Sequence, residues 1–300
     1  MTRFNLQAIL FIFILLGLVY FIRPNFSKQK NIITINDTIG FTSVKANVKN
    51  FIYSTDIIKP DNVRAKSVVI KKLGDSFSFL KVGADQRWPI ASVTKLMTAT
   101  IALEKFPPNR LISFNDKIVI TEGVSGGFQA GEIFTAIDLV KALMVVSSND
   151  AAMALAETYG RQNFIDAMQI KAVELGMRQT TFYDPTGLSF LNQSTIDDLE
   201  KLIKYVFEKH PEIFNFSREK KALIGGKKYL TNINEFAEQP NFIGGKTGYT
   251  DDASGNLISL FHDSFGGGAP ILIIVLGTDD RFGDTRILLD YFNNLRYNGH

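Results

Sequence analysis

The chain has 300 residues, of which 45% are hydrophobic and 21% charged, and its formal net charge is +3. Such a chain can bury a substantial core, while the mild charge and the lack of a dense lysine or arginine run argue against nucleic-acid binding. It contains no cysteine and only three well-separated histidines, so thiol catalysis and disulfides are excluded, and we expect neither metal nor cofactor.

The N-terminal segment is uncharged over residues 4–22, between Arg3 and Arg23. A helix of about 19 residues spans roughly 28 Å, close to the hydrocarbon thickness of a bilayer. The following residues offer no small-residue cleavage site, so a membrane anchor is favoured over a cleaved signal segment or a buried core helix. The predicted parts are an anchor or signal segment over residues 1–25, a stalk or leader over 26–64 and a folded domain over 65–300.

Apolar patterns after residue 65 predict strands at both ends of the domain and helices between them. The continuous apolar run over residues 271–276 is typical of a central strand that is buried on both faces. Thr135 with Asp138 has the spacing of a helix capping box, and so has Ser194 with Asp197. The predicted elements are strands 67–70 and 77–80, helices 92–106, 137–144, 150–160, 164–175 and 197–207, strands 241–249, 256–261 and 271–276, and a helix over 285–295. This order predicts a mixed α/β (α+β) fold with one sheet and a helical lobe.

The motif Ser-x-x-Lys occurs three times after residue 65, and local structure separates the copies. The pair Ser78 and Lys81 lies on a predicted strand, where positions i and i+3 face opposite sides. The pair beginning at Ser217 lies in a charged stretch. Only Ser92 stands at the head of a strongly apolar helix, where Lys95 shares its face and can reach its hydroxyl. Taken alone, the pair also fits an N-capping serine followed by a solvated lysine.

Two further polar segments follow in the chain. Ser147 and Asn149 belong to a Ser-x-Asn motif at a predicted corner between two helices, where a hydroxyl and an amide can relay a proton and hold a peptide. A helix N-cap is the alternative for this segment. Lys246 and Thr247 precede Gly248 in a glycine-rich strand, where they offer a cation and a hydroxyl to a carboxylate. A plain turn at the edge of a strand is the alternative.

The order Ser-x-x-Lys, Ser-x-Asn, Lys-Thr-Gly is that of β-lactamases and penicillin-binding proteins. The chain resembles the low-molecular-mass D-alanyl-D-alanine carboxypeptidases over about residues 66–292. One departure is Ser148, since these carboxypeptidases usually have glycine at the middle of Ser-x-Asn. The resemblance is carried by four segments: residues 89–99 (PIASVTKLMTA), 147–152 (SSNDAA), 184–188 (DPTGL) and 246–250 (KTGYT).

The resemblance implies a β-lactamase/transpeptidase-like fold, in which helices flank a five-stranded antiparallel sheet and an all-helical lobe adjoins it. It also implies the roles of particular residues. These are Ser92 as nucleophile, Lys95 as its general base, Ser147 and Asn149 on the helical wall, Lys246, Thr247 and Gly248 beside the substrate carboxylate, the backbone N–H groups of Ser92 and Tyr249 as oxyanion hole, and Arg281 as a second cation for the carboxylate.

The implied reaction is removal of the terminal D-alanine from peptidoglycan stem peptides through an acyl-enzyme, with β-lactam antibiotics as inhibitors. A D,D-endopeptidase or a β-lactamase with the same fold is an alternative, and so is a non-catalytic, membrane-tethered protein that binds peptidoglycan. Because peptidoglycan lies outside the cytoplasm, we expect the domain to lie there too, tethered by the N-terminal segment or secreted if that segment is cleaved.

Overall fold

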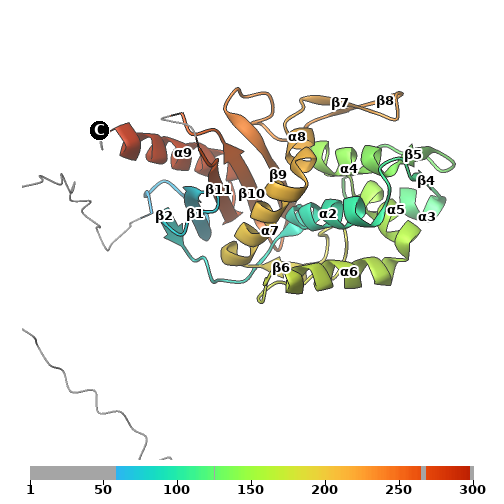
Figure 1. Ribbon diagram of the computed structural model, residues 1–300, viewed down its shortest axis with the longest axis horizontal. Coiled ribbons are helices and arrows are strands. Elements are labelled where there is room, and N and C mark those ends of the chain that lie inside the picture. Colours follow the sequence, from blue (N-terminus) through green and yellow to red (C-terminus); the bar gives the residue numbers. More distant parts are fainter. Residues whose placement is uncertain (1–58, 125, 265–267, 298–300) are drawn as a thin grey trace, which may run out of the picture. The chain divides into compact units, whose positions relative to one another are not determined.

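A five-stranded antiparallel sheet joins the beginning and the end of the folded domain. The computed structural model describes residues 59–124, 126–264 and 268–297. The strand order is β2-β1-β11-β10-β9 (Figure 1), and Ser67 of β1 lies opposite Leu276 of β11. All eight residues of β11 are buried, which confirms the predicted central strand. The strands are β1 (Ser67–Lys72), β2 (Ser78–Val82), β9 (Phe242–Thr250), β10 (Ser254–Phe261) and β11 (Ile271–Thr278), and the last helix is α9 (Arg281–Tyr297).

The sheet separates two apolar cores. Successive side chains of a strand point to opposite faces. Leu272 and Ile274 of β11 belong to the core shared with the helical lobe, whereas Ile273 and Val275 pack in the second core with Leu288 of α9. Each face of the central strand is therefore covered, which explains why its sequence is apolar without alternation.

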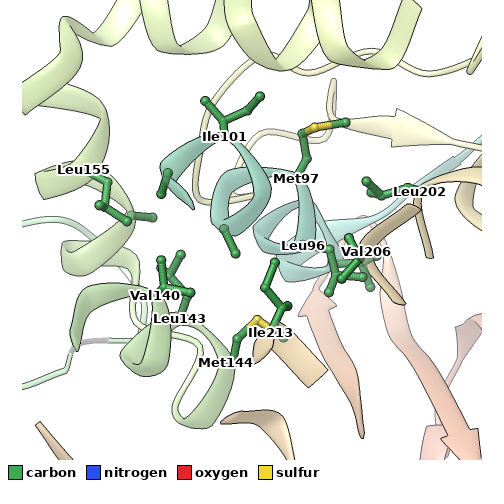
Figure 2. Packing of buried hydrophobic residues seen from close by; sticks show 14 of the residues in the cluster. Leu96, Met97, Ile101, Val140, Leu143, Met144, Leu155, Leu202, Val206 and Ile213 are labelled. Atoms are coloured by element: carbon green, nitrogen blue, oxygen red, sulfur yellow. The ribbon is translucent and has the colours of Figure 1, made fainter. Parts of the chain in front are cut away.

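Helix α2, which carries Lys95 at its start, lies at the centre of the helical lobe. Its residues from Lys95 to Ala102 are all buried. Figure 2 shows Leu96, Met97 and Ile101 surrounded by side chains of α4, α5, α7 and α8. Contact on every side fixes the position of this helix. The lobe consists of α2 (Lys95–Lys105), α4 (Ala136–Val145), α5 (Asn149–Tyr159), α6 (Arg161–Glu174), α7 (Ile196–Lys209) and α8 (Pro211–Ser217).

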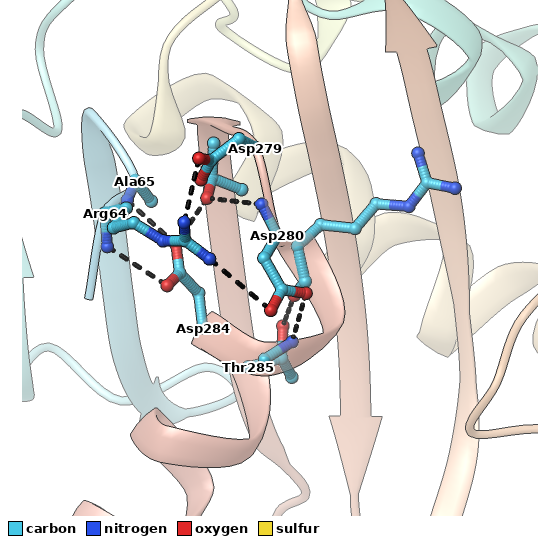
Figure 3. Close-up of polar contacts among 9 residues, drawn as sticks. Arg64, Ala65, Asp279, Asp280, Asp284 and Thr285 are labelled. Carbon is cyan, nitrogen blue, oxygen red and sulfur yellow. Dashed lines mark hydrogen bonds and ion pairs between the residues drawn. The ribbon is translucent and has the colours of Figure 1, made fainter. Parts of the chain in front are cut away.

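One buried carboxylate ties the start of the domain to the start of α9. Asp284, which is 1% exposed, accepts hydrogen bonds from the backbone N–H groups of Arg64 and Ala65 at 3.0 and 2.8 Å. Figure 3 shows Asp284 between Arg64 and Ala65. Asp284 also accepts a hydrogen bond from the hydroxyl of Thr278 at 2.6 Å. These bonds fix the first turn of α9, in which Arg281 lies.

The capping box predicted at the start of α4 is confirmed. The Thr135 hydroxyl accepts from the Asp138 N–H, and the Asp138 carboxylate accepts from the Thr135 N–H. The irregular stretch before it contains a short helix that the apolar pattern does not predict, capped by Asn115. The short elements are β3 (Trp88–Pro89), the 3-10 turn η1 (Ala91–Thr94), β4 (Leu111–Ser113), α3 (Asp116–Val119), β5 (Ile133–Thr135), β6 (Gln193–Ser194), β7 (Lys221–Ile224) and β8 (Lys228–Thr231).

The cap predicted at Ser194 is wrong by one residue. Thr195 is the N-cap of α7, and its hydroxyl accepts from the N–H of Asp198. Ser194 lies in β6 instead, where its hydroxyl is 2.8 Å from that of Thr180. A serine that is already engaged by a neighbouring segment leaves the cap to the next hydroxyl.

The predicted fold, an antiparallel sheet with flanking helices and a helical lobe, is confirmed. Within the described ranges no helix is both long and apolar enough to cross a bilayer. The anchor predicted over residues 1–25, and most of the leader predicted over 26–64, lie outside those ranges.

Candidate active site

Ser92 lies in the turn η1, held between two glycine-containing segments. A Cβ atom at Gly187 would lie 2.0 Å from the carbonyl oxygen of Ala91, and one at Gly248 would lie 2.9 Å from that of Ile90. Only glycine allows such close approach on both sides. The alternative of Ser92 as an N-cap is wrong, because the N-cap position of η1 is occupied by Ile90 and no side chain caps this turn.

The amine of Lys95 meets three oxygen atoms. Its Nζ lies 2.8 Å from Ser92 Oγ, 2.7 Å from Asn149 Oδ1 and 2.6 Å from the carbonyl oxygen of Thr186. The Asn149 amide is fixed in this orientation because its Nδ2 donates to the carbonyl of Glu122 at 2.7 Å. The amide and carbonyl oxygens can only accept, so a neutral amine gives them its two N–H groups and directs its lone pair at Ser92.

Burial changes the protonation of Lys95. The side chain is fully buried, and this lowers the pKa of Lys95 from 10.5 to about 7, against the opposing negative charges of Asp184 and Asp150. The alternative of a solvated lysine is wrong. A large fraction of the amine is thus neutral near pH 7, as a base for the Ser92 hydroxyl requires.

Lys246 and Ser147 join the strand β9 to the helical lobe. Lys246 Nζ donates to Ser147 Oγ and to the carbonyl of Thr247, each at 2.8 Å. Burial, together with the positive charges of Lys95 and Arg281, holds the pKa of Lys246 well below its ordinary value. A carboxylate placed beside this amine would relieve the repulsion between neighbouring cations, because an opposite charge favours the charged form.

The remaining predicted residues lie along the end of β9. Arg281 donates from Nη1 to the carbonyl of Gly248 at 3.1 Å, and its Nε is buried without a hydrogen-bond partner among the described residues. Thr247 is buried, whereas the side chain of Tyr249 is 61% exposed. The structure thus brings Ser92, Lys95 and Asn149 into direct contact, links Ser147 to Lys246, and sets Arg281 against Gly248.

Ser148, the unusual residue between Ser147 and Asn149, has a structural position. Its hydroxyl is buried, donates to the Asp150 carboxylate and accepts from the Ala151 N–H at 3.1 Å. Ser148 is the N-cap of α5, so the alternative of a helix cap in this segment is correct for Ser148. Its neighbours Ser147 and Asn149 instead contact Lys246 and Lys95. No group of three or more His, Asp or Glu side chains that could hold a metal ion is found within the described part of the chain.

The segment beginning at Asp184 has a role that residue types alone do not predict. The sequence marks it only as part of a resemblance, yet the backbone carbonyl of Thr186 completes the environment of Lys95 and Gly187 lies against Ala91. Every residue has a backbone carbonyl, so the residue type at position 186 does not indicate this contact. The only available signal is the pair Thr186-Gly187 following an acidic residue, which is typical of a tight turn.

Replacing Gly187 with alanine is expected to slow penicillin acylation at least tenfold. The new methyl group would overlap the Ala91 carbonyl, and overpacking of this kind costs about 1–3 kcal/mol beyond the strain of a positive φ. Acylation rate and denaturant unfolding measure the two effects.

Gly131→Ala is the matched control, because Gly131 has the same φ of +86° but nothing lies within 4 Å of the place that its Cβ would take. It is expected to lose only the roughly 1–2 kcal/mol of backbone strain and to keep the wild-type acylation rate. Equal behaviour of the two variants would contradict the role assigned to the contact with Ala91.

Comparison with known proteins agrees with this arrangement. The pattern of the Peptidase S11 family, the D-alanyl-D-alanine carboxypeptidases, matches residues 54–280. A D-alanyl-D-alanine endopeptidase of Haemophilus influenzae is 34% identical over 207 residues, which are 66% of this chain and 71% of the relative. A D-alanyl-D-alanine carboxypeptidase of Bacillus subtilis is 30% identical over 203 residues, covering 63% of this chain and 52% of the relative.

A solved structure gives the same result. Penicillin-binding protein D2 of Listeria monocytogenes, in its ampicillin-bound form, is 28% identical, with a TM-score of 0.68 over 75% of this chain and 96% of that chain. The two curated relatives are thus spanned for about half to seven tenths of their length. The family pattern covers most of the chain, including the segments that meet at Ser92, and the chain belongs to the D-alanyl-D-alanine carboxypeptidase family of serine peptidases.

Proposed function

We propose that the protein removes the terminal D-alanine from peptidoglycan stem peptides, with Ser92 as nucleophile. The observation that carries the proposal is the contact of 2.8 Å between Ser92 Oγ and Lys95 Nζ, an amine whose pKa of about 7 makes it a base at neutral pH. The other two oxygen atoms around Nζ direct its lone pair at the hydroxyl.

In the proposed acylation step, Ser92 Oγ attacks the carbonyl carbon between the last two D-alanine residues while Lys95 takes its proton. The bond from carbon to nitrogen then breaks, and the leaving D-alanine amine gains a proton. Ser147, whose hydroxyl accepts from Lys246, is proposed to relay to this amine the proton that Lys95 took from Ser92, so that Lys95 is neutral again before water attacks. Water next attacks the acyl-enzyme and regenerates Ser92.

The substrate carboxylate is proposed to bind beside Lys246, Thr247 and Arg281. Lys246 is buried, and its burial together with the positive charges of Lys95 and Arg281 lowers its pKa, a cost that a bound anion would offset. The backbone N–H groups of Ser92 and Tyr249 are proposed as the oxyanion hole, as the family resemblance implies. The side chains of Lys246, Thr247 and Arg281 would favour substrates that end in a free carboxylate.

Endopeptidase activity is the second candidate, because the relative from Haemophilus influenzae carries that name. The chemistry differs only in the leaving group, which would be the amine of a neighbouring stem peptide instead of free D-alanine. Lys95 and Ser92 would act in the same way in both reactions. The preference between the two reactions would therefore depend on which leaving group the cleft can accommodate.

The test treats the full chain with a pentapeptide ending in D-Ala-D-Ala, with a cross-linked peptide dimer and with penicillin. Release of D-alanine together with a lasting penicilloyl adduct on Ser92, located by mass spectrometry, is the expected result. Cleavage of the dimer alone would assign the endopeptidase reaction, and rapid loss of the adduct would assign a β-lactamase. Peptide binding without cleavage or adduct would overturn the enzymatic proposal.

We further propose that residues 1–25 anchor the protein in the membrane, with the domain outside the cytoplasm. The support is the uncharged stretch over residues 4–22 and the extracytoplasmic place of peptidoglycan. N-terminal sequencing of the mature protein tests this: an intact Met1 region in the membrane fraction is expected, and a new N-terminus beyond residue 25 would indicate a cleaved signal segment.

A further inference from the structure

Beside the site lies a buried carboxylate that takes no part in the proposed bond changes. Asp184 is 7% exposed. Its Oδ1 accepts from the N–H and hydroxyl of Thr186 at 2.7 and 2.6 Å and from the N–H of Gly187 at 2.8 Å. Its Oδ2 accepts from the N–H of Ser189 at 2.9 Å and from Asn192 Nδ2 at 2.8 Å. Five donors therefore point at one side chain, which organises the loop from residue 184 to 192.

We propose that Asp184 is a positioning residue, which holds this loop so that the Lys95 amine is aimed at Ser92 and places a fixed negative charge beside that amine. The inference rests on the proposed function of Ser92 and Lys95. It assigns to Asp184 two separable effects, one on geometry and one on charge.

The geometric effect passes through the loop backbone. The carbonyl of Thr186 accepts from Lys95 at 2.6 Å, and the carbonyl of Pro185 accepts from the hydroxyl of Thr98 at 2.6 Å. Lys95 and Thr98 are neighbours on one face of α2, so the loop is bonded to two adjacent points of that helix. If the loop moved, the Lys95 amine would lose one of the two acceptors that orient its lone pair.

The electrostatic effect has a known sign. The charged groups that act on Lys95 are Asp184 from the loop and Asp150 from α5, both of which raise its pKa, whereas Lys246 of β9 is a neighbouring cation that Lys95 influences in turn. Burial opposes the two carboxylates. Removing the charge of Asp184 would therefore make Lys95 easier to deprotonate and keep it neutral at lower pH.

Asparagine is not equivalent to aspartate at this position. An amide has one accepting oxygen and one NH₂ group, and the NH₂ would face the two donors that Oδ2 now accepts, Ser189 N–H and Asn192 Nδ2. Asp184→Asn thus removes the charge and disturbs the loop together, while Asp184→Glu keeps the charge and disturbs only the fit.

The experiment measures the acylation rate of the full chain by fluorescent penicillin between about pH 5 and pH 9, where the rate is expected to rise with the deprotonation of Lys95. Asp184→Asn is expected to lower the rate about tenfold and to move the midpoint to lower pH by roughly half a pH unit or more. Asp184→Glu is expected to lower the rate while keeping the wild-type midpoint.

Asp198→Asn is the matched control. Asp198 is 3% exposed and also organises backbone, accepting from the Gln179 N–H at 2.7 Å and the Thr180 hydroxyl at 2.9 Å, but it is not among the charges that act on Lys95. It is expected to leave the midpoint unchanged. If Asp184 had only a structural role, Asp184→Asn would slow acylation by the same factor at every pH and would also leave the midpoint unchanged. That outcome would overturn the inference.

A second variant keeps the inference testable if Asp184→Asn does not fold. Thr98→Val preserves shape and removes the short bond to the Pro185 carbonyl, along with a long one of 3.4 Å to the Thr94 carbonyl within the same helix, so it is expected to slow acylation several-fold at an unchanged midpoint. A wild-type rate for Thr98→Val would contradict the geometric effect. Failure of the wild-type chain to be acylated would instead reject the proposed function itself.

Discussion

A chain in which Ser92 is replaced by alanine is expected to take no covalent label from fluorescent penicillin and to lose nearly all of its release of D-alanine. The proposed reaction forms a bond to Ser92 Oγ, and Lys95 Nζ meets no other side-chain hydroxyl among the described contacts. Loss of the nucleophile therefore leaves only residual catalysis, a fall of at least about 1,000-fold. Gel labelling and chromatographic detection of D-alanine measure the two losses.

Ser78→Ala is the matched control, since Ser78 belongs to another Ser-x-x-Lys motif that lies on strand β2. The Lys81 amine of that motif pairs with Asp197 instead of with a serine. The control is expected to label like the wild type. Labelling that survived Ser92→Ala, or that vanished in Ser78→Ala, would place the nucleophile elsewhere.

The second large effect is expected at Lys95. Lys95→Met keeps an apolar chain of similar length but removes the base, so acylation should fall roughly 100- to 10,000-fold. In the wild type the pKa of Lys95 lies near 7, and a lysine is neutral above its pKa. The acylation rate of the wild type should therefore rise with pH, reach half of its maximum near pH 7 and stay constant above, while the residual rate of Lys95→Met should lack this rise.

Stopped-flow labelling over this pH range measures both the rate and its midpoint. Lys81→Met is the control, because Lys81 is the lysine of the motif on β2 and is partly exposed. It is expected to retain both the rate and the pH dependence. A Lys95→Met variant with the wild-type pH profile would show that another group takes the proton from Ser92.

Much of the fold was predictable because apolar patterns record burial directly. The run that became β11 is buried on both faces, and the helix that begins at Lys95 is apolar because it is surrounded. The three-motif order predicted which distant residues meet, and the contacts of Lys95 with Ser92 and Asn149 agree with it. Tertiary context explains the misplaced cap at Ser194, whose hydroxyl contacts Thr180 and leaves the cap to Thr195.

Other features of the site were beyond the sequence because backbone atoms create them. The Thr186 carbonyl contacts Lys95 whatever side chain stands at that position, so no residue type announces it. The 3-10 turn at Ser92 depends on close approach by Gly187 and Gly248 from distant segments. The protonation of Lys95 likewise follows from how completely it is enclosed and not from its neighbours in sequence.

The pairing of β1 with β11 has a consequence for the order in which the protein is assembled. β11 is the last of the five strands in chain order, yet it occupies the middle of the sheet, between β1 and β10. A nascent polypeptide that stops before Ile271 contains only two separate hairpins of this sheet, β1 with β2 and β9 with β10. The five-stranded sheet therefore cannot close until β11 has been synthesised, about 200 residues after β1, and contacts of such long sequence separation are slow to form.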